Sequence, residues 1–173
     1  MRRLLDFIYR AAAAAAGLCL VLMTLLILAQ VVGRWFDILV PSTEDFSGFL
    51  LAAASFLALP YALREGAHIR VTLLISRLGP KARRAVEAAV LLLALPLLAY
   101  IAWALGFMVY ESWQFQELTQ GYVAVPLWIP QLPVALGAAL MAIALADEAV
   151  ALFRQGQTHY QAVENRHLEE DIG

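Results

Sequence analysis

Four long apolar segments constrain the fold of this chain more than any other feature. They cover residues 11–33, 42–63, 88–110 and 127–153, and they hold very few charged side chains. An α-helix rises 1.5 Å per residue, so the first segment reaches about 34 Å, enough to cross a bilayer core of about 30 Å. The segments therefore predict an all-α integral membrane protein with four transmembrane helices.

The composition agrees with this prediction. The chain is 62% hydrophobic and 15% charged, whereas soluble domains carry roughly 45–50% apolar and roughly 25% charged residues. We predict one membrane domain over residues 1–153, followed by a polar cytoplasmic tail over residues 154–173. We expect membrane lipids to surround this domain, and we expect no nucleic-acid partner.

The placement of lysine and arginine predicts the orientation in the membrane. The chain has 12 such residues, and all but Arg34 fall before the first segment, between the second and third, or after the fourth. Cytoplasmic connections of membrane proteins carry an excess of these residues. Both termini and the connection over residues 64–87 are therefore predicted to be cytoplasmic.

Several chemistries are excluded by the residues that the segments lack. Haem held between membrane helices needs axial ligands in the spans, but His68, His159 and His167 all lie outside them. The chain has a single cysteine, Cys19, so it has no redox pair of cysteines. No zinc-ligand cluster and no phosphate-binding loop is present in the sequence. We expect no catalytic residue, no cofactor and no metal site.

A transport pathway inside this chain is also disfavoured. Proton-coupled carriers place carboxylates within the membrane. The acidic residues nearest the predicted spans all fall at span ends: Glu44, Asp45, Glu87, Asp147 and Glu148. The pattern favours a supporting subunit, while two alternatives stay open: a small stand-alone carrier, monomeric or oligomeric, and a membrane anchor for an enzyme complex.

Three stretches carry a resemblance to a known family. They read QVVGRWF at the end of the first segment, STEDFSGFLLAAASFLALPYALREGAHIRVTLL through the second, and PLWIPQLPVALGAAL at the start of the fourth. Together they resemble the small membrane subunit of tripartite ATP-independent periplasmic (TRAP) transporters over residues 5–153. The REGAHIRV stretch is the most specific part, and Thr72 follows it where family members often have aspartate.

The resemblance implies a three-part importer in a bacterial inner membrane. A periplasmic binding protein captures a solute, usually an organic acid, and a large multi-span membrane subunit moves it by an elevator motion driven by a sodium gradient. The small subunit stays with the large one as a static scaffold. Sodium ions are then expected to bind the large subunit and not this chain. The sequence does not encode the identity of the solute.

Three sets of residues are candidates for structural or binding roles. The candidates for structure or a partner interface are Arg34, Glu44, Asp45, Arg64, Glu65, His68, Arg70, Pro126, Pro130 and Pro133. The candidates for lipid headgroup contacts are Arg77, Lys81, Arg83 and Arg84. The candidates for docking the binding protein are Glu111 and Glu117, in a connection predicted to be periplasmic.

Two expectations concern particular contacts. Arg34 either sits among lipid headgroups or forms an ion pair with Glu44 or Asp45 that ties the first two spans together. In the cytoplasmic connection, Arg64 is expected to reach water or headgroups.

Local expectations about helix shape come from proline and small residues. Regular helix in the fourth span is expected to begin near Pro130, because proline is tolerated in a first turn. Small residues spaced four apart, such as Ala102 and Gly106, mark faces where membrane helices approach closely.

Overall fold

The computed structural model describes residues 2–65 and 79–155 of the chain. This part contains four helices: α1 (Arg2–Trp35), α2 (Thr43–Arg64), α4 (Pro80–Gln114) and α5 (Trp128–Gln155). Each of the four is long and apolar enough to cross a membrane. The prediction of an all-α protein with four membrane-spanning helices is therefore confirmed, and the helices run past the predicted spans, most clearly at the start of α1.

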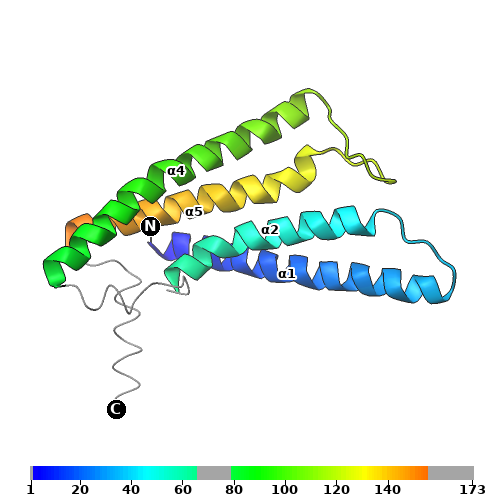
Figure 1. The fold of residues 1–173 in the computed structure, drawn as a ribbon, viewed down its shortest axis with the longest axis horizontal. Helices are drawn as coiled ribbons and strands as arrows, with labels where there is room; N and C mark the ends of the chain where they lie inside the picture. Colours follow the sequence, from blue (N-terminus) through cyan, green and yellow to red (C-terminus); the bar gives the residue numbers. More distant parts are fainter. Residues whose placement is uncertain (1, 66–78, 156–173) are drawn as a thin grey trace, which may run out of the picture.

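The helices lie side by side in the order α1, α2, α5, α4 (Figure 1). The extensive contacts join α1 to α2, α2 to α5, and α5 to α4. The arrangement is therefore a row, with α1 and α4 at its two edges. Of the most apolar window of each helix, 28% is buried in α2 and in α5, against 11% in α1 and 6% in α4.

The row has two different ends. At one, called the ionic end, α1 and α4 begin while α2 and α5 finish (Figure 1). At the other, called the loop end, the connections over residues 36–42 and 115–127 join the helices in pairs. The first connection ends at Ser42, which has a left-handed backbone (φ 55°) and precedes the first turn of α2.

The core is densest at the ionic end. One buried cluster there takes residues from all four helices, among them Tyr9, Leu63, Leu91 and Leu145. A second cluster along the α1–α2 contact is built largely from alanine, as in Ala12, Ala16 and Ala54. Small side chains let the two helix backbones approach closely, which is how helices pack without a hydrophobic driving force in lipid.

The contact between α2 and α5 depends on a proline and a glycine. Pro60 lies inside α2 and has no backbone N–H, so the carbonyl of Phe56 loses its usual helical donor. That carbonyl faces Gly137 of α5, where an added Cβ would lie 2.5 Å from the Phe56 oxygen. Only glycine fits this approach, and its Cα–H groups can partly satisfy the carbonyl.

The fourth helix starts close to the expected position. Helix α5 begins at Trp128, two residues before Pro130. Pro130 is nevertheless within the first turn, where a backbone N–H has no partner in the helix, so it does not delay the start. Helix α4 likewise continues through Pro96 as one element.

Candidate functional site

An ionic cluster joins three helices at the ionic end of the row. Arg64, the last residue of α2, donates a hydrogen bond from Nη1 to Oδ2 of Asp147 on α5 at 3.0 Å. Its Nη2 pairs with the carboxylate of Asp6 on α1. The Arg64 side chain is only 14% exposed, so the expectation that it reaches water or headgroups was wrong. It turns inward because carboxylates from two other helices meet its planar guanidinium.

Two further buried residues surround this arginine. The ring of Tyr9, which is 1% exposed, lies under the guanidinium with 5.6 Å between the Arg64 Cζ and the ring centroid. Such a cation–π contact stabilises a partly desolvated arginine by about 1–2 kcal/mol. The side chain of Glu148, next to Asp147 in sequence, is fully buried. The Tyr9 hydroxyl has no hydrogen-bond partner among the described residues.

The cluster is suited to fastening helices and not to passing ions. Arg64 engages one carboxylate on each neighbouring helix, and removing it would leave both partly exposed carboxylates without their counter-charge. In the part of the chain that the structure describes, no three histidine, cysteine or acidic residues are placed to hold a metal ion. The geometry therefore indicates a structural site.

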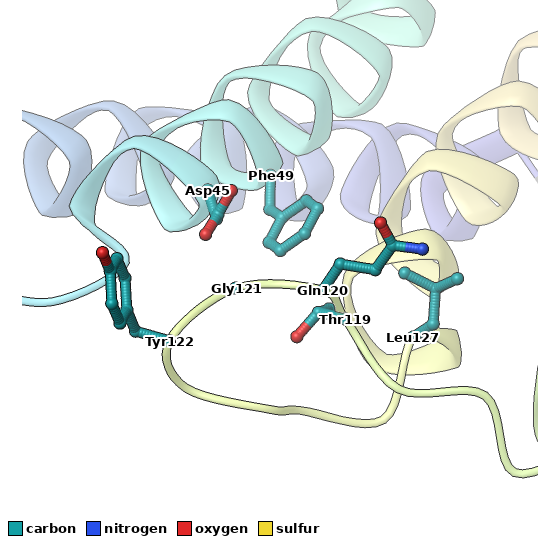
Figure 2. A pocket seen from close by; sticks show the side chains of 7 residues that line it. All are labelled: Asp45, Phe49, Thr119, Gln120, Gly121, Tyr122 and Leu127. Atoms are coloured by element: carbon teal, nitrogen blue, oxygen red, sulfur yellow. The ribbon is translucent and has the colours of Figure 1, made fainter.

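The alternative ion pair at the loop end is not formed. Arg34 takes part in no ion pair with another described side chain, and the pairs that Arg64 forms go to Asp6 and Asp147. Arg34 is exposed in the last turn of α1 and lines a pocket of about 250 Å³ with Gln30 and Asp37. Asp45 instead faces the 115–127 connection (Figure 2). The headgroup alternative for Arg34 stays a prediction.

A pocket of about 460 Å³ lies where this connection meets α2 (Figure 2). Asp45 and Phe49 point from α2 toward the loop, which passes beneath them (Figure 2). Gly121 comes so close to the Asp45 carboxylate and the Ser42 hydroxyl that a Cβ would overlap them. The lining residues are Asp45, Phe49, Thr119, Gln120, Gly121, Tyr122 and Leu127.

The loop itself is ordered by its own hydrogen bonds. Backbone bonds run from the Thr119 N–H to the Val125 carbonyl and from the Leu127 N–H to the Glu117 carbonyl, both at 2.9 Å. The Val123 N–H donates to Oγ of Ser42 at 3.0 Å, which fixes the loop to the start of α2. The carboxylate of Glu117 accepts a hydrogen bond from the buried Ser112 hydroxyl at 2.9 Å. Residues 115–127 thus form a hairpin-like loop that presents exposed rings such as Tyr122.

The remaining sequence candidates are distributed as follows. Glu65 caps the end of α2 with its backbone N–H, and Glu44 and Glu111 are exposed. Pro126 pairs with Leu118 in a single antiparallel bridge. Pro130 and Pro133 are half-buried within α5. His68, Arg70 and Arg77 lie outside the described residues, as do the side chains of Lys81, Arg83 and Arg84.

Comparison with known families decides the classification. The family model for the DctQ component of tripartite ATP-independent periplasmic transporters matches residues 23–155. The chain belongs to the DctQ family. It is accordingly a small component of a TRAP transporter, and the family resemblance expected from the sequence is confirmed. No curated protein matches the chain.

The match also shows which part of the ionic cluster lies inside the DctQ region. Arg64 and Asp147 fall within the matched residues, whereas Asp6 and Tyr9 precede them. Sequence reasoning singled out Arg64 but missed Asp6 and Tyr9. A signal was present, because an acid and an aromatic three residues apart share one helix face at the end of an apolar span.

Proposed function

We propose that this DctQ-family chain is the non-catalytic scaffold subunit of a sodium-coupled importer for an organic-acid-like solute. The observation that carries the proposal is where the charged side chains of the helices lie and what they pair with. Arg64 pairs with Asp6 and Asp147 at one end of the row, and no charged side chain occupies the middle of a described helix. The described helices therefore offer no charged group near the middle of the bilayer with which to bind an ion or a polar solute.

The division of labour follows from this absence of a pathway. The large membrane subunit carries the solute and the sodium ions, and the small subunit enlarges its fixed part within the bilayer. This chain then holds no cofactor, and its partners are the large multi-span subunit, the periplasmic solute-binding protein and membrane lipids. The membership in a family of TRAP transporter components supports this assignment.

Reconstitution tests the proposal directly. Liposomes are prepared with the large subunit and this chain together, with each alone, and with neither, and binding protein loaded from a panel of labelled organic acids is added outside. An inward sodium gradient should drive uptake only with both membrane components present. Uptake by this chain alone would overturn the scaffold role and support the stand-alone carrier.

The proposed orientation places the ionic end in the cytoplasm and the loop end in the periplasm of a bacterial inner membrane. The basic residues near the chain termini and in the 64–87 connection support it. A reporter that is active only in the cytoplasm should therefore function when fused after Gly173 and fail when inserted at Tyr122. The opposite pattern would reverse the orientation.

The stretch over residues 111–126 is the proposed contact for the solute-binding protein on this chain. Its internal hydrogen bonds hold Glu117 in place, whereas Glu111 is exposed on the last turns of α4. Replacing Glu111 by glutamine should weaken docking of the binding protein, measured by its affinity for the assembled complex. Unchanged affinity in the Glu111→Gln complex would remove this residue from the interface.

A further inference from the structure

The outer face of α4 carries a continuous ladder of aromatic rings. The ladder consists of Tyr100, Trp103, Phe107, Tyr110 and Trp113, spaced three or four residues apart. Neighbouring ring centroids are 6.0, 5.8, 6.5 and 6.3 Å apart along the helix. The rings are between 47% and 64% exposed, so the described chain leaves about half of their surface uncovered.

The ladder reaches too deep into the membrane to be an interfacial belt. Aromatic side chains facing lipid gather at the headgroup level. Trp113 fits that level, one residue from the end of α4, but Tyr100 lies roughly 20 Å further along the helix axis, near the middle of the span. The deep half of the ladder therefore needs another explanation than headgroup anchoring.

The polar atoms of the ladder indicate that this face contacts another protein and not lipid. The Tyr100 hydroxyl and the Trp103 indole N–H are donors, and neither has a hydrogen-bond partner among the described residues. Hydrocarbon chains offer no acceptor, and an unsatisfied donor there costs free energy. A helix from another protein supplies carbonyl and side-chain acceptors at that depth.

The size of the face fits a stable contact within the bilayer. A fully buried aromatic side chain covers 150–250 Å², so five rings about half exposed offer roughly 500 Å². Leu93 and Leu97, which are 75% and 60% exposed, extend the same face toward the ionic end. The total approaches the roughly 800 Å² per partner of a standard interface. Gly106 adds an open spot beside the rings, with no atom within 4 Å of a Cβ placed there.

We propose that this α4 face, defined by the aromatic ladder with Leu93 and Leu97, is the surface that binds the large membrane subunit. The inference rests on the proposed function, and it names α4 as the helix through which the small subunit binds the large one. A second copy of this chain is the poorer occupant, because it would set one projecting row of rings against an identical row, and ridges pack into grooves. Helix α4 also stands at the edge of the row, where a partner reaches it without displacing α1 or α2 (Figure 1).

Photo-crosslinking in intact membranes identifies the occupant. The cross-linker p-benzoylphenylalanine is incorporated in place of Phe107, and in a matched strain in place of Leu25, which is similarly exposed on α1 (56% against 47%). The expected result is an adduct with the large subunit from position 107 and none from position 25. An adduct of twice the 19.0 kDa chain mass, or lipid adducts alone, would overturn the proposal.

Co-purification measures the strength of the same contact. The double variant Trp103→Ala/Phe107→Ala should lower the amount of large subunit recovered with the chain at least tenfold. The control Leu25→Ala/Leu28→Ala, which trims two exposed leucines of α1, should change it less than twofold. Equal recovery with both variants would contradict the α4 surface while leaving the scaffold role intact. Failure of the unaltered chain to recover any large subunit would instead overturn the proposed function itself.

Discussion

At the scale of single residues, Arg64 explains more of the structure than any other side chain. It ends α2, lies over the Tyr9 ring and binds carboxylates on α1 and α5. A partly buried arginine of this kind contributes little net stability relative to a well-packed apolar replacement, but its removal leaves its partners unpaired. The role of Arg64 is therefore best measured by truncating its side chain.

Replacing Arg64 by alanine should destabilise the folded chain by about 3 kcal/mol, because Asp6 and Asp147 lose their shared counter-charge. Breaking a buried ion pair costs about 3–5 kcal/mol. The loss is expected at the lower end of that range because Asp6 is 44% exposed, so water can solvate its carboxylate. Thermal unfolding in detergent micelles measures the effect. Arg34→Ala is the matched control and should cost less than about 0.5 kcal/mol, because Arg34 is exposed and forms no ion pair with described residues. Equal losses in the two variants would contradict the ionic cluster.

Tyr9→Phe offers a finer test of the same place. The substitution removes a buried hydroxyl without a partner and keeps the ring that faces Arg64, so the unfolding temperature should stay the same or rise slightly. Tyr9→Ala should in contrast lower stability by about 3 kcal/mol, since it opens a cavity in the core. If Tyr9→Phe alone cost more than about 1 kcal/mol, the hydroxyl would have an important partner.

At the scale of helices, the least tolerant contact is the one between α2 and α5. Two sequence features that are individually unfavourable in helices, Pro60 and Gly137, meet there. The two residues are linked, because Pro60 leaves the Phe56 carbonyl without its helical donor and Gly137 leaves room for that carbonyl on the facing helix. A substitution that fills this space should separate the two helices.

Gly137→Ala should therefore destabilise the chain by about 1–3 kcal/mol, although alanine is the better helix former. Gly17→Ala on α1 is the control, because a Cβ there meets no atom within 4 Å. That variant should be neutral or stabilising by up to about 1 kcal/mol. Urea or detergent titration monitored by circular dichroism compares the two. A stabilising effect at both positions would show that α2 and α5 are further apart than the structure has them.

The helices were predictable from sequence to a greater degree than their contacts. Hydropathy alone placed the four spans, because the bilayer requires long apolar segments wherever a chain crosses it. Arg64 was recognised as a candidate, but its partners were not, since Asp6 and Asp147 lie 58 and 83 residues away. The Gly137 contact was missed for a related reason: the carbonyl that requires it belongs to another helix. Contacts between distant residues depend on the order of the row, which no local pattern encodes.

At the scale of the whole molecule, two fastenings hold the row together. The ionic cluster joins α1, α2 and α5 at one end, and the bond from Val123 to Ser42 ties the α4–α5 connection to α2 at the other. Helix α2 takes part in both. Its length of 22 residues separates them by roughly 33 Å, so they should act independently.

Independence can be measured by combining substitutions. Ser42→Ala alone should cost about 1 kcal/mol, the value of one lost hydrogen bond. The double variant Ser42→Ala/Arg64→Ala should lose the sum of the two single effects within about 0.5 kcal/mol. Thermal unfolding of the four proteins closes the cycle. A coupling energy above 1 kcal/mol would mean that the two ends of the row communicate.

The position of Arg64 between an early and a late carboxylate has a consequence for biosynthesis. Asp6 leaves the ribosome first, Arg64 follows 58 residues later, and Asp147 arrives only after a further 83 residues. The pair between α1 and α2 can thus close while α4 and α5 are still being translated. Insertion would then proceed in two stages: an early helical hairpin forms with its Arg64–Asp6 pair closed, and the last helix then brings a second carboxylate to the same arginine.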